Sequence, residues 1–359
     1  MPHGWGKTPN LPDATDRIRM VTIGLHPMRF LPLLLPAALA ACVTATPDCA
    51  ERVPLASAGW TLVYRNLPLD SRNPAVTRAV VMVHGAGRNA DDYFRTAVAA
   101  AFLAGALDHT VVLAPRFASN AGGTCADKLA EGEISYPCSG QSWRSGGPLK
   151  GAANLSSFDL MDQILRRLAN RSTFPNMKSI VVTGHSAGGQ FSSRYAMSNN
   201  VHDTLGVPVR YVVSNPSSYA YPEPARPTGA CTEKGCEGGL RPFREGGNCT
   251  TFNRWPYGLE QRQGYAAQVS DSDLKARMAA RPTTYLMGTL DTLPIAGFDG
   301  SCPAMAQGLN RFERGLGFWH MMRERYQAKH DFVPVPLCGH NARCVYTSDQ
   351  ALPVLFPRL

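Results

Sequence analysis

The sequence lacks the features of several protein classes. Its 36 Lys and Arg residues are scattered, and no basic block with interleaved aromatic residues occurs, although the net charge is +9. We therefore expect no nucleic-acid partner; a basic surface facing anionic lipid or polymer is the milder interpretation. No apolar run is long enough for a membrane span. Hydrophobic residues make up 44% and charged residues only 18% of the chain, a balance that argues against global disorder.

Metal-ligand spacing is also missing. None of the ten cysteines forms a Cys-x-x-Cys pair, and the nine histidines do not cluster with them. We therefore expect neither a metal nor another cofactor. Ten cysteines are many for a protein of a reducing compartment, so disulfides in an oxidising compartment are the better interpretation.

Residues 1–41 are predicted to be a leader with a signal peptide. Arg29 supplies a positive charge, and an apolar run of about a dozen residues follows it. The run ends in Leu39-Ala40-Ala41-Cys42, which resembles a bacterial lipobox. The resemblance implies cleavage before Cys42 and a lipid on its thiol, which would anchor the protein to a membrane of the bacterial envelope. An ordinary secretory signal, giving a secreted or periplasmic protein, is the alternative.

Apolar strand-like runs alternate with helical patterns along the rest of the chain. This alternation predicts an α/β fold, with a mostly parallel central sheet and helices on both faces. We expect a tether at 42–58, the folded domain at 59–359, and a Cys/Pro/Gly-rich insertion within it at about 221–281. The expected strands are 60–67, 79–83, 110–114, 179–183, 209–214, 283–287 and 331–335, and the expected helices are 91–103, 158–168, 191–197 and 305–319.

The most informative motif is Gly184-His185-Ser186-Ala187-Gly188. It follows the apolar run at 179–183 and precedes a helical pattern, which is the strand–turn–helix context that gives G-x-S-x-G its meaning. The glycines leave room for a cramped turn. Ser186 is therefore a candidate nucleophile at the tip of that turn, and it needs a base, an acid and oxyanion donors.

Three further polar elements follow predicted strands. They are His84-Gly85-Ala86-Gly87, Asp291 and His340, and the carboxyl ends of parallel strands are where function gathers in α/β sheets. The order oxyanion-type loop, serine, acid, histidine resembles the α/β-hydrolase superfamily, from about residue 79 to the C-terminus. Residues 80–93 and those around Ser186 are similar to the esterase and poly(hydroxyalkanoate)-depolymerase-like branch.

The expected base and the expected acid each have rivals in the sequence. His340 is the expected base, whereas His84 is expected to brace the oxyanion loop and His185 to point away from the serine. Asp291 is the expected acid, with Asp299 as its rival. The resemblance implies the backbone N–H groups of Ala86 and Ala187 as oxyanion donors. Arg144 is expected to meet either a substrate carboxylate or a surface partner.

The resulting hypothesis is a serine hydrolase that cleaves carboxylic esters, small or polymeric, through an acyl-enzyme. A peptidase or amidase with the same triad, or a silent binding protein on a hydrolase scaffold, are the alternatives. Two arrangements of the cysteines stay open. Either Cys42 is lipidated and Cys49 is free, or the two pair. Cys125–Cys138 and Cys338–Cys344 are expected as local pairs, and two more pairs are expected among Cys231, Cys236, Cys249 and Cys302, whose connectivity the sequence does not give.

Overall fold

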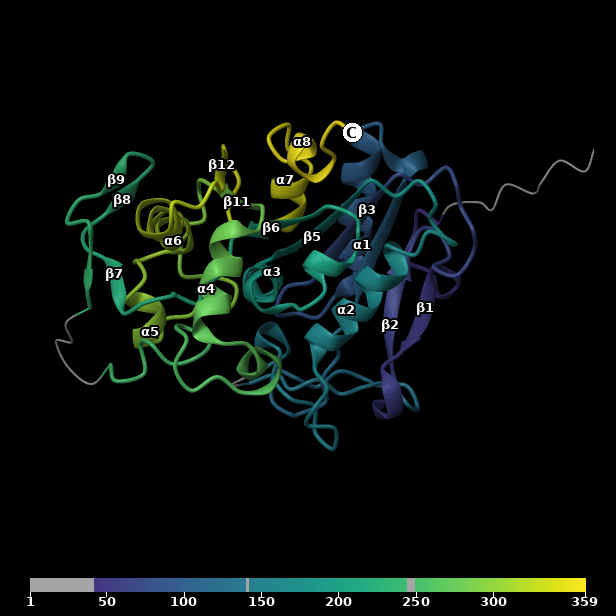
Figure 1. The fold of residues 1–359 in the computed structure, drawn as a ribbon, viewed down its shortest axis with the longest axis horizontal. Coiled ribbons are helices and arrows are strands. Elements are labelled where there is room, and N and C mark those ends of the chain that lie inside the picture. Colours follow the sequence, from purple (N-terminus) through teal and green to yellow (C-terminus); the bar gives the residue numbers. More distant parts are fainter. Residues whose placement is uncertain (1–41, 140–141, 244–248) are drawn as a thin grey trace, which may run out of the picture. The chain divides into compact units, whose positions relative to one another are not determined.

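An eight-stranded sheet forms the centre of the fold (Figure 1). The computed structural model describes residues 42–139, 142–243 and 249–359. The strand order is β1-β2-β4-β3-β5-β6-β11-β12, and every pairing from β4 to β12 is parallel. The strands are β1 (Ala50–Pro54), β2 (Trp60–Arg65), β3 (Arg78–Val83), β4 (Thr110–Pro115), β5 (Ser179–His185), β6 (Val209–Ser214), β11 (Thr283–Gly288) and β12 (Asp331–Val335). The expected α/β class with a mostly parallel sheet is confirmed.

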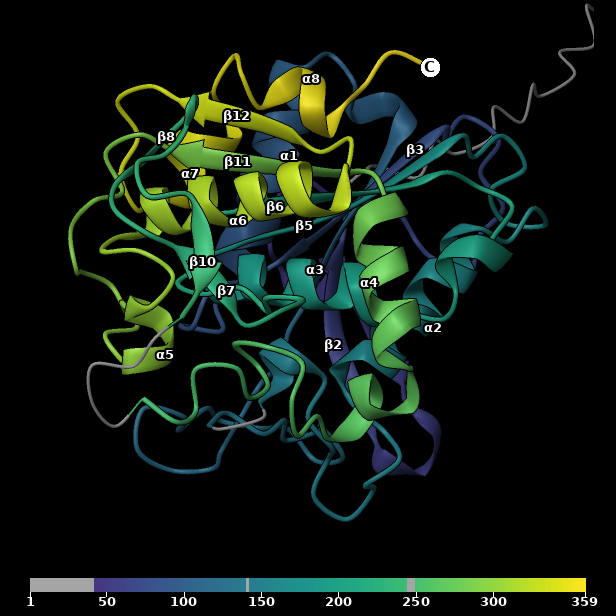
Figure 2. The same ribbon diagram turned by 60° about the vertical axis from the view of Figure 1, so that its left-hand side comes forward.

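Helices cover both faces of the sheet because the central strands are apolar on both sides. Neighbouring residues of β5, Val181 and Val182, enter two different core clusters. One face carries α2 (Ser157–Leu168), α3 (Ala187–Ser198), α4 (Asp271–Ala280) and α6 (Arg311–Tyr326); the other carries α1 (Ala90–Leu103), α7 (Ala342–Tyr346) and α8 (Leu352–Leu355) (Figure 2). In the described ranges, no helix has both the length and the apolar character needed to cross a bilayer.

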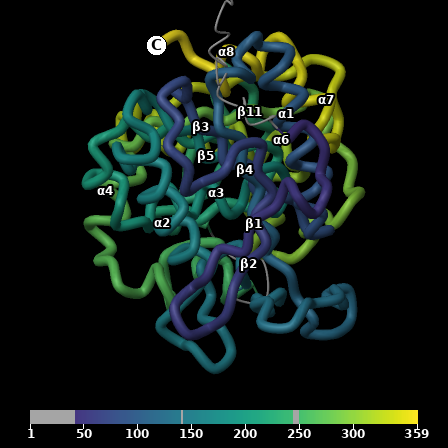
Figure 3. Tube along the Cα trace, turned by 90° about the vertical axis from the view of Figure 1, so that its right-hand side faces the viewer, coloured from purple at the N-terminus to yellow at the C-terminus, as the bar shows by residue number. Residues whose placement is uncertain are grey.

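The β1–β2 edge differs from the tether predicted for 42–58. Ala50–Pro54 pairs antiparallel with β2, which itself pairs antiparallel with β4 (Figure 3). Val53 is buried in the core, and Arg65 on β2 forms an ion pair with Glu51 on β1 at 2.8 Å. This segment is therefore an edge strand of the domain. The predicted leader, 1–41, lies outside the described residues.

The predicted insertion is present between β6 and β11. It holds two small antiparallel pairs, formed by β7 (Ala225–Pro227) with β10 (Leu240–Pro242) and by β8 (Cys231–Thr232) with β9 (Gly235–Cys236). Its last part differs from the expectation of a loop-rich segment. Leu274 and Met278 of α4 are buried in a core cluster with Val213 of β6, so α4 belongs to the layer that covers the sheet.

All ten cysteines lie in disulfides. The pairs are Cys42–Cys49, Cys125–Cys138, Cys231–Cys236, Cys249–Cys302 and Cys338–Cys344. Cys249–Cys302 joins the insertion to α5 (Cys302–Met305), which follows Asp291 in the chain. Cys42–Cys49 is the second of the two arrangements that the sequence left open.

Candidate active site

Ser186 stands at a sharp turn between β5 and α3. Its backbone has φ 60° and ψ −117°, a conformation that side-chain-bearing residues rarely adopt. The backbone N–H of Ser186 donates to Ser214 O at 2.9 Å, which ties the turn to the end of β6. The turn therefore presents the serine beyond the carboxyl end of the sheet.

Three glycines let the turn lie directly on the sheet. A Cβ on Gly184 would collide with the carbonyl of Gly188, and a Cβ on Gly188 would collide with the carbonyls of Val83 and His84. A Cβ on Gly189 would collide with the carbonyl of Ser214. These obstacles are backbone atoms, so no side-chain rotation could relieve them.

Asp291 and His340 meet beside the serine turn. Asp291 follows β11, His340 follows β12, and His340 Nδ1 lies 2.7 Å from Asp291 Oδ2. A carboxylate accepts, so Nδ1 carries the proton and Nε2 is left as a proton acceptor. The disulfide Cys338–Cys344 brackets His340 and closes its loop.

Two buried side chains that the sequence did not single out hold Asp291. Asn215 Nδ2 donates to Asp291 Oδ2 at 2.7 Å, and Arg311 Nη1 lies 3.4 Å from Oδ1. Arg311 also donates to Ser217 Oγ and to the carbonyls of Ile295 and Ala296. The available signal for Asn215 was its position directly after β6, at the sheet edge where the other polar residues gather.

Ser186 and His340 line one cleft. Its volume is about 580 Å³, and its wall also includes Gly85, Ala86 and His185. In the described part of the chain, no hydrogen bond joins Ser186 Oγ to His340, although both face this cleft. Such bonds are often long without a substrate and tighten only when one is bound.

His185 lies against His340, beside the cleft that Ser186 lines. The two ring centroids are 4.5 Å apart, and His185 also lines the cleft. Burial lowers the pKa of His185 well below its usual value, and the neighbouring His340 lowers it further. His185 is therefore neutral, and its Nδ1 faces Tyr93 Oη at 3.4 Å rather than a carboxylate.

The proposed oxyanion donors flank the serine. Ala86 is exposed on the cleft wall, and a Cβ on its neighbour Gly85 would lie 3.7 Å from Ser186 Cβ. Ala187 is the first residue of α3, and the first N–H groups of a helix have no acceptor within it. Ala86 and Ala187 therefore remain the candidate oxyanion donors.

Comparison with known proteins agrees with this arrangement. Residues 80–352, about three quarters of the chain, match the family described as "Alpha/beta hydrolase family". The chain belongs to the alpha/beta hydrolase family. A search of curated protein sequences finds no match.

Solved structures share the fold of this hydrolase family member. It aligns with LpqC, a poly(3-hydroxybutyrate) depolymerase from Bordetella parapertussis, at TM-score 0.56 and 20% identity, over 86% of this chain and 89% of that one. It also aligns with poly(aspartic acid) hydrolase-1 from Sphingomonas sp. KT-1 at TM-score 0.58 and 20% identity, over 84% of this chain and 96% of that one.

His84 braces the 84–87 loop of this family member through its own ring contacts. The backbone N–H of Phe117 donates to His84 Nε2 at 2.9 Å, so Nδ1 carries the proton and donates to Gly85 O at 2.8 Å. Burial lowers the pKa of His84 to about 4, which keeps the ring neutral. Trp143 packs edge-on against the ring.

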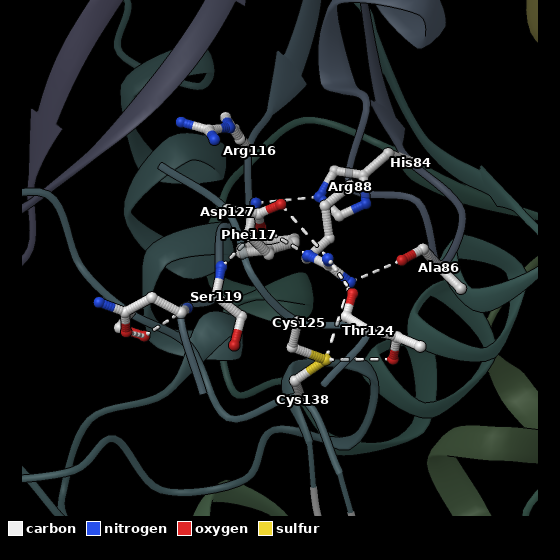
Figure 4. Close-up of polar contacts among 12 residues, drawn as sticks. His84, Ala86, Arg88, Arg116, Phe117, Ser119, Thr124, Cys125, Asp127 and Cys138 are labelled. Carbon is white, nitrogen blue, oxygen red and sulfur yellow. Dashed lines mark hydrogen bonds and ion pairs between the residues drawn. A yellow bond between two sulfur atoms is a disulfide. The ribbon is translucent and has the colours of Figure 1, made fainter. Parts of the chain in front are cut away.

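Arg88 is a second brace that the sequence did not reveal. Figure 4 shows its guanidinium between Ala86 of the 84–87 loop and Thr124 and Asp127 of the excursion that follows β4. It donates to Ala86 O at 2.7 Å, to Thr124 O at 2.8 Å and to Asp127 Oδ2 at 2.6 Å. Burial would raise the pKa of Asp127, but the hydrogen bonds from Arg88 and the Ser119 N–H outweigh it and lower that pKa. The carbonyl that Arg88 holds belongs to the same residue whose N–H would face the oxyanion.

We expect Arg88→Lys to lower kcat about tenfold to a hundredfold with a smaller change in KM. Lysine keeps the charge but cannot hold three acceptors in one plane. The Ala86 backbone would then be held less firmly, and its N–H would no longer be oriented toward the position of the oxyanion. The measurement is steady-state ester hydrolysis together with thermal unfolding. Arg116→Lys is the matched control, because Arg116 forms its ion pair with Glu133 in the same excursion. Unchanged kcat with a lower Tm would reduce Arg88 to a structural role.

Asp299, the rival acid, lies elsewhere. Its Oδ2 accepts from Tyr257 Oη at 2.8 Å, and its Oδ1 accepts from the Ser301 N–H at 3.0 Å. Among the residues that the structure describes, Arg144 does not form the surface salt bridge that was one of its two expected roles. It is half-buried and lines a separate cavity together with Asp299. Within the described ranges, no three His, Cys, Asp or Glu side chains gather as a metal site requires.

Proposed function

We propose that this family member is a serine hydrolase that cleaves carboxylic esters through a covalent acyl-enzyme. The observation that supports this most is the Asp291–His340 contact at 2.7 Å on the cleft that Ser186 shares. It gives the imidazole the tautomer that a general base needs. The unusual backbone of Ser186 adds the strained turn expected of such a nucleophile.

In the proposed reaction, Ser186 Oγ attacks the acyl carbon while His340 Nε2 takes its proton. The carbonyl electrons move onto oxygen, where the N–H groups of Ala86 and Ala187 stabilise the oxyanion. The intermediate collapses, and the alcohol leaves with the proton from His340. Water, activated by the same histidine, then attacks the acyl-enzyme and releases the carboxylic acid.

A panel of p-nitrophenyl esters and aminoacyl anilides tests the bond preference. We expect turnover of the esters and labelling by a fluorophosphonate. Turnover of the anilides alone would assign the site to amide bonds, and a lack of both turnover and labelling would overturn the proposed function.

We also propose that the protein is exported, because five disulfides require an oxidising compartment. The sulfur of Cys42 can bond either to a lipid or to Cys49, but not to both. A lipid anchor at Cys42 needs this sulfur as a thioether, whereas the structure has it in a disulfide with Cys49. The structure therefore favours an exported protein without that anchor.

Peptide mapping decides between the two states of Cys42. Both Cys42 and Cys49 fall in the tryptic peptide that ends at Arg52. We expect this peptide, prepared with iodoacetamide and without reductant, to carry no alkyl group and to be lighter by two hydrogens than its reduced form. An acylated Cys42 beside an alkylated Cys49 would restore the lipid anchor in place of the disulfide.

A further inference from the structure

A second cavity, of about 310 Å³, lies along α3 from the serine turn. Its wall includes Gln190 and Arg194, which lie one turn apart on α3 and follow Ser186 by four and eight residues. At the rise of an α-helix, these residues lie roughly 6 and 12 Å beyond Ser186 along the axis. Helical side chains lean toward the N-terminus, which brings both toward the serine.

Two arginines line this cavity without an ionic partner. Arg194 is only 2% exposed, and Arg144 is half-buried. In the described part of the chain, neither guanidinium has a carboxylate within 4.0 Å. Burial, together with repulsion from Arg144, lowers the pKa of Arg194 to about 9, so this group stays charged at neutral pH. Burial also lowers the pKa of Arg144.

The partners that these arginines do have are few and neutral. Arg194 donates to Pro256 O at 3.2 Å and to Ser218 Oγ at 3.1 Å. Arg144 donates to Ser142 Oγ at 3.0 Å and to Gln190 Oε1 at 3.5 Å. Each guanidinium has five N–H donors, and among the described residues only two of the five are used in each case, which leaves the others for a ligand.

Other buried arginines of the chain are satisfied differently. Arg311 faces Asp291, and Arg88 is paired with Asp127. Arg226 donates to several backbone carbonyls and lies over the Tyr221 ring; Arg314 does the same with the Phe298 ring. Arg226 lines a cavity of its own, with its guanidinium held by those carbonyls. The Arg144–Arg194 pair differs in that two guanidinium groups with few protein partners line one cavity.

One carboxylate, Asp299, is on the cavity wall, and its oxygens already accept from Tyr257 and Ser301. Burial raises the pKa of Tyr257, so that side chain is neutral. Two arginines against one aspartate leave the wall with one net positive charge. The missing counter-charge fits a ligand that brings a single anionic group.

We propose that the cavity between Arg144 and Arg194 binds a free carboxylate carried by the ester substrate. Planar guanidinium groups match the two oxygens of a carboxylate. The substrate class would then be half-esters, in which an acyl or alcohol part ends in a carboxylate within reach of the serine. This inference rests on the proposed ester hydrolysis for the identity of the ligand, but the anion site can be measured without catalysis.

The binding test uses monomethyl glutarate and dimethyl glutarate, which differ by one carboxylate. Both are titrated by calorimetry into the Ser186→Ala protein, in low-salt buffer free of carboxylate and phosphate. We expect the half-ester to bind at least about tenfold more tightly than the diester, as charge-assisted hydrogen bonds allow. Adding Arg144→Gln should remove most of this preference. Arg166→Gln, which removes an exposed charge from α2, is the matched control and should keep it.

The kinetic test uses the same two esters with otherwise unaltered protein. We expect the ratio of kcat/KM for the half-ester to that for the diester to fall about tenfold in Arg144→Gln. Arg144→Lys should recover part of the ratio, and Arg166→Gln should leave it as in the parent. A ratio is used because a general loss of folding would lower both rates together.

The outcomes separate the two proposals. Equal binding of the two esters, with a ratio that does not respond to Arg144, would overturn the carboxylate site while diester turnover still supports ester hydrolysis. Binding of the half-ester through Arg144 in a protein that hydrolyses neither ester would keep the carboxylate site and overturn the hydrolase mechanism.

Discussion

Replacing Ser186 by alanine is expected to reduce ester hydrolysis at least about a thousandfold and to abolish fluorophosphonate labelling. Alanine keeps the turn but removes the atom that would form the acyl-enzyme, so only unassisted attack by water in the oxyanion site remains. Initial rates on a p-nitrophenyl ester and in-gel labelling measure the two effects.

Ser193→Ala is the matched control for that substitution. Ser193 is half-buried on α3, about two helical turns after Ser186. Replacing it should leave the rate and the labelling as in the parent protein. If Ser186→Ala kept more than about a tenth of the rate, a different nucleophile would carry the reaction and the proposed mechanism would be wrong.

The second large effect is expected from Asp291→Asn, which should lower kcat by about four orders of magnitude with little change in KM. Both carboxylate oxygens now face donors: His340 and Asn215 at Oδ2, and Arg311 at Oδ1. An amide must turn its NH₂ toward one of them. If it turns toward His340, the ring takes the tautomer that cannot accept the serine proton.

The same substitution should also lower Tm, since it leaves the fully buried Arg311 without its carboxylate. Asp299→Asn separates the two candidate acids, because Asp299 contacts Tyr257 and Ser301 rather than His340. We expect a far smaller effect on kcat from it. A larger loss in Asp299→Asn than in Asp291→Asn would exchange their roles.

The serine turn and its strand-end companions could be predicted because their signals are local. Gly184 and Gly188 are required by backbone contacts within and beside the turn, so they show in the sequence as fixed spacing. Asp291 and His340 directly follow apolar strands, and parallel strands bring their carboxyl ends to one edge. Strand order along the sheet was not needed to place them together.

The supports of the site could not be predicted, because their partners are remote in the chain. Arg88 meets Asp127, and Arg311 meets Asp291 and Ser217, only after the excursion and α6 have packed. An arginine in a sequence is normally a surface residue, so nothing in the local pattern marks these as buried.

Local patterns also misled at two elements. Met305 and Leu309 extended an apparent helix face, but Leu309 is 70% exposed and Gly308 has φ 144°, so the long helix begins only at Arg311. The sequence did not predict strand β1, because Glu51, Arg52 and Pro54 obscure the alternation of apolar and polar residues that marks a strand. Those residues suit an edge strand, where charge and proline discourage further pairing.

The contacts of Gly184, Gly188 and Gly189 have an electrostatic consequence. Because Gly188 and Gly189 carry no side chain, the first turn of α3 is held against the ends of β3 and β6. The positive end of the helix dipole, equivalent to roughly half an elementary charge, is thereby fixed beside Ser186. Ser186 is only 8% exposed, so little water screens this field. The glycines thus provide the serine with a standing positive potential, which in the proposed reaction would need no reorganisation as negative charge develops on the acyl oxygen.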